Sequence, residues 1–225
     1  MLKPVLQEGK NDDYQLFALA GEAYQQNKNP SAAAEQFEKA AAIDPKNVGL
    51  HTQLGTSLVL AGQTAQGVTE LENAVKLDSS QYKADFALVL VYLQQSQFDS
   101  ALSALAEFEK KQPDNPNVYI LKGVAFLGKN DPASARKNYE RALAVRPASV
   151  AAAMNLVQLD LREKNTADAR KRLDAILSND KNNLQAMIAM AETASAEGNE
   201  QEFLAWLDKA AKANPAAVQP RVIMA

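Results

Sequence analysis

At 225 residues, of which 47% are apolar and 23% charged, the chain can bury a large core and is not expected to be disordered. Its 24 Lys and Arg nearly balance its 27 Asp and Glu, so the net charge of −3 gives no reason to expect a nucleic acid as partner. The absence of cysteine excludes disulfides, thiolate catalysis and zinc sites built on sulfur. The apolar stretches are too short to span a bilayer, so we expect no direct membrane insertion by this segment.

One pattern of residues recurs every 34 residues along the chain without insertion or deletion. It has two columns of mostly small residues and one column in which proline dominates. The first small column holds Gly21, Gly55, Val89, Gly123, Val157 and Ala191. The second holds Ala33, Gly67, Ala101, Ala135, Ala169 and Phe203, and the proline column holds Pro45, Ser79, Pro113, Pro147, Lys181 and Pro215. This period predicts a solenoid of repeated units, each of which packs on its neighbours.

The first repeat, residues 14–47, has the pattern of a helical hairpin. Apolar residues at helical spacing predict two helices with a break at residues 27–30. Pro30 fits the start of the second helix, where its missing N–H costs nothing, and Pro45 ends that helix. We expect the same hairpin in residues 48–81, 82–115, 116–149, 150–183 and 184–217.

Side-chain size predicts how these hairpins pack. The small columns let the two helices of a pair approach closely, and a column of large residues fills the space toward the next repeat. The large column holds Phe37, Leu71, Leu105, Tyr139, Leu173 and Leu207. Because Val89, Val157 and Phe203 replace small residues, we predict wider hairpins in the third, fifth and sixth repeats.

The repeats leave a short segment at each end, residues 1–13 and residues 218–225. The first has the pattern of the remnant of a preceding helix, and the second that of the start of a seventh repeat. Because solenoids normally end in polar caps, we expect the chain to be part of a longer array. Its open ends could associate head to tail, through Leu2 and Leu6 at one end and Val222, Ile223 and Met224 at the other.

Small, small, large and proline at these offsets resemble the tetratricopeptide repeat (TPR). The first repeat follows the family pattern at eight positions, with Phe in place of Trp and Ala in place of Leu: Phe17, Ala20, Gly21, Tyr24, Ala33, Phe37, Ala40 and Pro45. The resemblance implies an all-α, right-handed α-solenoid of antiparallel helix pairs, with six full repeats and partial flanking helices. Asp160 departs from the pattern at a place where the family prefers an aromatic residue, so the fifth repeat is expected to be the least regular.

The resemblance also implies a concave groove, made by five positions of each first helix. On this sequence these positions are polar in the outer repeats and apolar in the middle. The apolar residues are the candidate partner-binding groove: Val59, Leu60, Phe86, Leu90, Leu93, Ile120, Val124, Leu127, Met154 and Leu161. An exposed apolar patch of this extent marks a partner site, whereas the alternative is that these side chains pack on their own second helices or on one another.

Catalytic chemistry is not expected from the remaining polar residues. His51 is the single histidine, lies in the column of Phe17 and Tyr119, and is interpreted as structural. No phosphate-binding or cofactor motif occurs, so we expect no cofactor, no metal and no enzyme activity. The basic residues between Arg136 and Arg172 alternate with acids, which favours a salt-bridged face over a phosphate-binding strip.

Two functions remain open at this point. The first is a protein–protein interaction scaffold that binds an apolar or amphipathic peptide segment in its groove. The second is an architectural spacer, because the Ala-rich repeats are similar to those of bacterial TPR lipoproteins of PEP-CTERM/exosortase and exopolysaccharide systems. That resemblance implies a place in a bacterial envelope assembly for exopolysaccharide export or protein sorting, and a periplasmic location. Without it, a cytoplasmic location is expected.

Overall fold

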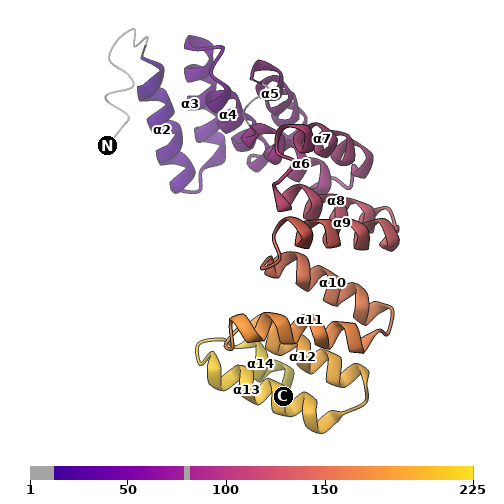
Figure 1. Cartoon of the computed structure of the whole chain (residues 1–225). Coiled ribbons are helices and arrows are strands. Elements are labelled where there is room, and N and C mark those ends of the chain that lie inside the picture. The colour runs from indigo at the N-terminus through magenta and orange to yellow at the C-terminus, as the bar shows by residue number, and fades with distance from the viewer. Residues whose placement is uncertain (1–12, 79–81, 225) are drawn as a thin grey trace. The chain divides into compact units, whose positions relative to one another are not determined.

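The computed structural model describes residues 13–78 and 82–224, and the regular structure in these ranges is entirely helical (Figure 1). The helices form consecutive pairs, which confirms the predicted all-α class built of helical hairpins. The pairs are α2 (Tyr14–Gln26) with α3 (Pro30–Ile43), α4 (Val48–Leu60) with α5 (Thr64–Leu77), α6 (Lys83–Gln94) with α7 (Phe98–Lys111), α8 (Pro116–Gly128) with α9 (Pro132–Val145), α10 (Val150–Arg162) with α11 (Thr166–Asn179), and α12 (Leu184–Ala196) with α13 (Glu200–Ala213). A short helix, α14 (Gln219–Met224), follows the last pair.

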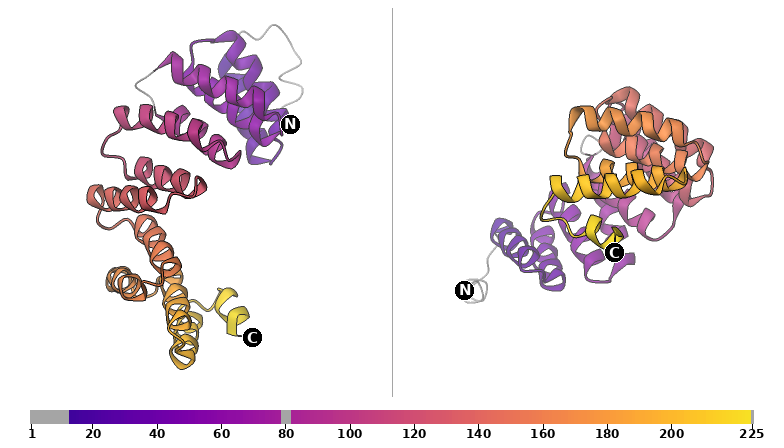
Figure 2. Two further views of the ribbon diagram at one scale, coloured as in Figure 1. Left: turned by 90° about the vertical axis from the view of Figure 1, so that its right-hand side faces the viewer. Right: turned by 90° about the horizontal axis from the view of Figure 1, so that it is seen from below.

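The chain divides into two compact parts between Pro113 and Asp114. We call the part with α2–α7 the N-terminal half and the part with α8–α14 the C-terminal half. Within each half the two helices of a pair lie side by side (Figure 2), and each second helix also packs against the first helix of the next pair. Each half is therefore a stack in which a hairpin contacts its sequence neighbours.

Polar side chains define where most helices begin. Asn29 Oδ1 accepts from the backbone N–H of Ala32 at 3.2 Å, and Asp131 Oδ1 accepts from that of Ser134 at 2.9 Å. These bonds satisfy N–H groups that have no partner inside the helix. Pro30 and Pro132 lie at the first helical position, as the sequence predicts.

Each first helix ends in the same turn, which contains one residue of left-handed backbone conformation. These residues are spaced by 34 positions: Lys28 (φ 56°), Gly62 (83°), Ser96 (58°), Asn130 (60°), Lys164 (59°) and Gly198 (75°). The following amide donates back into the helix, as from Asn29 N to Tyr24 O at 2.9 Å. Main-chain hydrogen bonds thus close every turn between paired helices.

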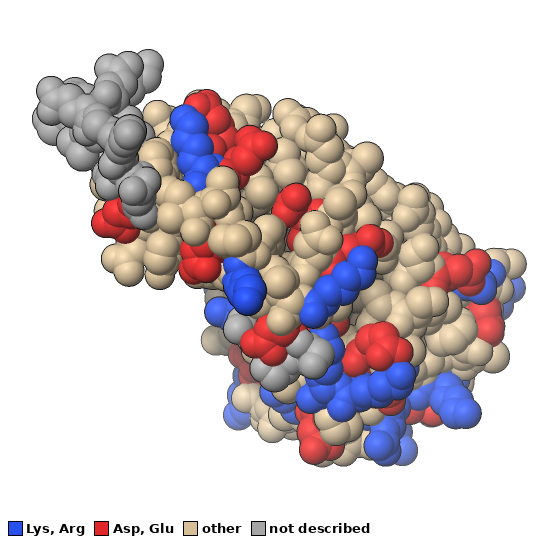
Figure 3. Space-filling view, turned by 90° about the horizontal axis from the view of Figure 1, so that it is seen from above, with Lys and Arg blue, Asp and Glu red and all other residues tan. Residues whose placement is uncertain are grey.

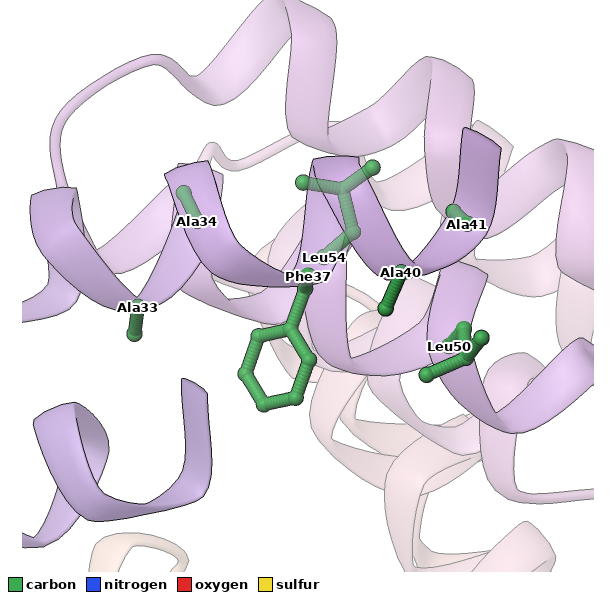
Figure 4. Packing of buried hydrophobic residues seen from close by; sticks show 7 residues of the cluster. All are labelled: Ala33, Ala34, Phe37, Ala40, Ala41, Leu50 and Leu54. Carbon is green, nitrogen blue, oxygen red and sulfur yellow. The ribbon is translucent and has the colours of Figure 1, made fainter. Parts of the chain in front are cut away.

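The small columns allow the close helix packing that the sequence predicts. A Cβ atom on Gly21 would lie 2.7 Å from the ring of Phe37, and one on Gly55 would lie 2.8 Å from the carbonyl oxygen of Gly67. Every residue of the large column is at most 1% exposed. Figure 4 shows Phe37 in the core of the N-terminal half, with Ala33 and Ala40 on its own helix and Leu50 and Leu54 from α4.

The predicted departures from regular packing are confirmed at two places and wrong at a third. Helices α6 and α7, with Val89, and α10 and α11, with Val157, pack less closely than the other pairs. Helices α12 and α13 do not separate in this way, and Phe203 is half-buried. The expectation that the fifth repeat is the least regular is also not confirmed, since the third pair is as loosely packed. Among the helices of residues 13–78 and 82–224, none is both long and apolar enough to cross a bilayer.

Candidate partner-binding groove

The candidate groove residues of the N-terminal half differ in how far they reach solvent. Leu60 on α4 is 66% exposed and Leu90 on α6 is 44% exposed. Phe86 and Leu93 are half-buried, and the ring of Phe86 meets that of Phe108 edge-on at 6.4 Å between centroids. Val59 packs inward beside Leu71, in the cluster between α4, α5 and α6. Because α4 and α6 are in contact, the exposed leucines lie on neighbouring first helices.

The candidate residues of the C-terminal half are more strongly packed into its core. Val124 on α8 is 38% exposed. Ile120 and Leu127 pack against the cluster that contains Tyr139 and Leu156. Met154 and Leu161 pack against a second cluster, around Val157, Leu173 and Met190. Part of the surface of these four side chains is therefore buried against other residues of the same chain, which is the alternative that the sequence leaves open.

Polar side chains at the margins of the groove positions link successive first helices. Gln25 Nε2 donates to Ser57 Oγ at 2.9 Å between α2 and α4, and Gln158 Nε2 donates to Glu192 Oε2 at 3.5 Å between α10 and α12. The Thr56 hydroxyl donates to the carbonyl of Thr52 within its own helix at 2.7 Å. These hydrogen bonds fix the positions of polar side chains that lie beside the apolar residues.

Three of the basic residues between Arg136 and Arg172 pair with acids, as the sequence predicts: Arg136, Arg170 and Arg172. The fully buried carboxylate of Asp160 lies between Arg136 Nη1 at 2.7 Å and Arg172 Nε at 2.9 Å, and Arg136 also reaches Glu163 at 2.9 Å. Asp160 thus joins α9, α10 and α11 through charge, where the sequence indicates only a missing aromatic residue. Removal of either arginine would leave part of a buried charge uncompensated, which is costly.

A second ion-pair group surrounds Arg170. Its Nε donates to Glu197 Oε1 at 3.0 Å and its Nη1 to Glu202 Oε1 at 2.7 Å. Hydrogen bonding from Arg170 lowers the pKa of both Glu197 and Glu202. In the face of the molecule shown in Figure 3, blue and red side chains are interspersed.

His51 is held by contacts at both nitrogens of its ring. Its Nδ1 lies 2.7 Å from Glu70 Oε2 and its Nε2 lies 3.0 Å from the carbonyl oxygen of Pro45, so both ring nitrogens have partners. Asp85, in the same column of the next repeat, is 2% exposed and pairs with Lys111 Nζ at 2.7 Å. In the part of the chain that the structure describes, no three His, Cys, Asp or Glu residues form a metal-binding group.

Of the two ends that were predicted to associate head to tail, one lies within the described residues. Leu2 and Leu6, predicted to offer one end for self-association, lie outside the described residues. At the other end, Val222, Ile223 and Met224 on α14 are 65%, 40% and 36% exposed.

Comparison with known families gives matches along most of the array. Models described as tetratricopeptide repeat match residues 14–47, 52–116, 86–131 and 126–186. The chain belongs to the tetratricopeptide repeat family. The TPR resemblance inferred from the repeated columns is thereby confirmed.

The TPR chain is also similar to part of a larger protein from barley. A probable UDP-N-acetylglucosamine–peptide N-acetylglucosaminyltransferase, SPINDLY, of Hordeum vulgare is 34% identical over 103 residues, which are 43% of this chain. This match spans only 11% of the length of SPINDLY.

Solved structures share the fold of the TPR chain at low sequence identity. Pseudomonas aeruginosa PilF has a TM-score of 0.71 at 18% identity, with 96% of this chain and 99% of PilF covered. YrrB, described as a TPR protein with an unusual peptide-binding site, has a TM-score of 0.58 at 18% identity, with 85% of this chain and 98% of YrrB covered.

Proposed function

We propose that this TPR chain is a non-catalytic protein-interaction scaffold whose first helices bind an apolar or amphipathic peptide segment. The observation that carries the proposal is the exposure of Leu60 and Leu90, at 66% and 44%, on the neighbouring helices α4 and α6. Grouped apolar side chains on a solvent-facing surface are stabilised when a partner covers them. An amphipathic segment fits because its apolar side can cover the leucines while its polar side stays in water.

The energetics favour Leu60 and Leu90 as anchors within the ten candidate residues. Full burial of one leucine side chain contributes about 1.5–3 kcal/mol relative to its exposed state. The half-buried members, such as Met154 and Leu161, have less surface left to lose. We therefore assign the ten residues to the binding surface of their respective halves, with the exposed leucines as the main contributors.

One comparison supports a binding function without identifying a ligand. The description of YrrB mentions a peptide-binding site, and its fold resembles that of this chain. The match to SPINDLY covers 11% of that protein, and we do not carry its transferase activity over to this chain.

The proposal can be tested with peptides selected from a displayed library of amphipathic 15-residue sequences against the immobilised chain. Leu60→Ala and Leu90→Ala should each weaken the selected peptides about tenfold, as expected for truncated anchors, with unchanged helix content by circular dichroism. The chain offers matched controls in Leu19→Ala and Leu204→Ala, since these leucines are 59% and 44% exposed outside the groove positions. Equal losses in controls and groove variants, or wild-type affinity in both groove variants, would refute the groove.

The architectural role in a bacterial envelope assembly stays a prediction from the sequence resemblance. Head-to-tail association is supported by the exposure of Val222 and Ile223 on α14. Sedimentation of the wild type and of Val222→Asp over a concentration series tests it. A wild-type monomer at every concentration would remove this possibility.

A further inference from the structure

A cavity of about 360 Å³ lies in the C-terminal half, between the end of α9, the first turns of α10 and one side of α11. Its walls are largely apolar, with Leu143, Val150, Ala153 and Ile176 among them. Charged residues of both signs also line it: Asp168, Lys171, Arg172 and Asp180. The volume is within the range of sites that hold small ligands or single large side chains. None of the ten groove residues lines this cavity.

The fifth repeat has alanine at two wall positions of the cavity where the other repeats have larger residues. Ala153 is the fourth residue of its repeat, and every other repeat has a larger residue there: Phe17, His51, Asp85, Tyr119 and Met187. Ala175, also in the cavity wall, corresponds to Arg141 one repeat earlier. In that earlier repeat the guanidinium carbon of Arg141 lies 5.6 Å from the centroid of the Tyr119 ring. The fifth repeat thus has two alanines where the fourth has a stacked tyrosine and arginine.

The preceding repeat shows what the cavity would accommodate. Tyr119 is 4% exposed and packs against Ala142, which corresponds to the wall residue Ile176. An aromatic ring that enters the fifth repeat beside Ala153 would meet Ile176, which is larger than Ala142 and narrows the space on that side. Aromatic rings combine a large apolar surface with few rotatable bonds, so they suit a preformed apolar cavity.

The polar side of the cavity has a residue that can contact an aromatic ring, Arg172. In the second repeat, Glu70 contacts the ring nitrogen of His51 at 2.7 Å, and the residue that corresponds to Glu70 in the fifth repeat is Arg172. Arg172 lines the cavity, and its Nε is held by Asp160 Oδ2 at 2.9 Å. A guanidinium held in this way can stack on an aromatic face without first being ordered.

We propose that the cavity at Ala153 binds a tyrosine or phenylalanine side chain of a partner polypeptide, which takes the place that Tyr119 occupies in the preceding repeat. A side chain of a partner polypeptide can enter from solvent, because Pro147 and Lys171 in the wall of the cavity are exposed. The two acidic and two basic residues can meet either sign of charge beside that ring. This site is separate from the proposed groove and does not depend on it.

The test uses N-acetyltyrosinamide and N-acetylphenylalaninamide as probes, with N-acetylleucinamide as the aliphatic control. Methyl NMR titrations of the full chain should show shifts at Ala153, Ala175 and Ile176 with the aromatic amides, at an affinity at least about fivefold above that of the leucine amide. Ala153→Tyr restores the usual side chain and should abolish these shifts without lowering the melting temperature. Ala151→Tyr, which adds the same side chain at an exposed position of α10, should leave them unchanged.

If the tyrosine variant does not fold, Ala153→Met replaces it in the test, because the next repeat has Met187 in this column. This variant should also abolish the shifts. Tyr119→Ala should create a second set of shifts around Ala142. The proposal is overturned if neither aromatic amide binds, if the leucine amide binds equally well, or if filling the cavity leaves binding intact. p-Cresol is titrated as a fourth probe, and binding of p-cresol alone would also overturn the proposal, because it would indicate a small-molecule site. If Ala153→Tyr dissociates oligomers of the wild-type chain, the occupant is a second copy and the proposed foreign partner is wrong.

Discussion

Replacement of Tyr139 by phenylalanine should stabilise the C-terminal half. The side chain of Tyr139 is fully buried, and within the described residues its hydroxyl has no hydrogen-bond partner. A buried hydroxyl without a partner costs about 1–3 kcal/mol, because it gives up its bonds to water. Loss of the oxygen leaves a void smaller than a methyl group, which costs less than about 1 kcal/mol. We expect a net gain of about 1 kcal/mol in the free energy of unfolding.

The same burial predicts a difference at alkaline pH. Burial raises the pKa of Tyr139 to about 12 from its ordinary value of 10.0. Because the folded value is the higher one, the neutral phenol contributes stability that is fully present below pH 10 and is lost as the pH rises toward 12. Tyr139→Phe removes this contribution, so the variant should lose less stability than the wild type between pH 10 and about 12.

Urea unfolding followed by the fluorescence of Trp206 measures both effects, because this single tryptophan lies on α13 in the same half. The urea midpoint should rise while the slope of the transition stays constant. Tyr82→Phe, followed by circular dichroism because Tyr82 lies in the other half, is the control, since Tyr82 is 41% exposed and its change should be near zero. A loss of 1 kcal/mol or more in Tyr139→Phe, a figure typical of a broken hydrogen bond, would show that the hydroxyl is satisfied and refute the reasoning.

Three further changes test the hairpin packing, the turns and the ion pairs. Gly67→Ala would place a Cβ 2.7 Å from the carbonyl oxygen of Gly55, so α4 and α5 must separate, and urea unfolding by circular dichroism should show a loss of about 1–3 kcal/mol. Lys164 has a left-handed backbone with φ 59°, so Lys164→Gly relieves strain in the folded state. Glycine also makes the unfolded chain more flexible, which cancels part of this gain, and thermal unfolding should show a net stabilisation of about 0.5 kcal/mol. Arg170→Met should destabilise at pH 7, and the difference from wild type should shrink below pH 4.5. The sign follows because Arg170 lowers the pKa of Glu197, so its contribution is present above pH 4.5 and is lost as the pH falls through the lower folded value.

Each of these changes has a control in the same chain. Gly49→Ala lies on an exposed part of α4 and should alter stability by less than about 1 kcal/mol, and an equal loss at both glycines would exclude close helix packing as the cause. Gly198→Ala, at the equivalent turn position, should destabilise, and a gain there would contradict the cost of the left-handed conformation. Lys171→Met removes a neighbouring positive charge, so a pH dependence like that of Arg170→Met would assign the effect to net charge.

The repeated columns were sufficient to predict the helix pairs and the core, because a hairpin depends on local spacing and on residue size. Gly21, Gly55 and Phe37 have the predicted roles for this reason. Exposure of the groove residues could not be predicted in this way, since it depends on how each first helix packs against its neighbours. Val59 and Leu60 are adjacent in sequence, yet one packs inward and the other is 66% exposed.

Features that depend on two columns at once were also missed. The cavity is lined by Ala153 and Ala175 together, and each alanine alone is an ordinary helix residue. The buried ion pairs of Asp160 require Arg136 and Arg172 from two other helices. Glycine at positions 62 and 198 is the residue type that signals a left-handed turn, but the equivalent positions hold lysine, serine and asparagine, which do not signal it.

The uniform turn between paired helices has a consequence for how the chain acquires its structure. Since main-chain bonds close each turn, a helical hairpin can begin to form as soon as its own residues are available. Contacts between near neighbours in sequence carry a small entropic cost of loop closure, and chains dominated by them fold quickly. During synthesis from the N-terminus, each completed hairpin would dock on the one before it within the same half. Little apolar surface would then stay exposed until distant residues are made, and the risk of aggregation stays low.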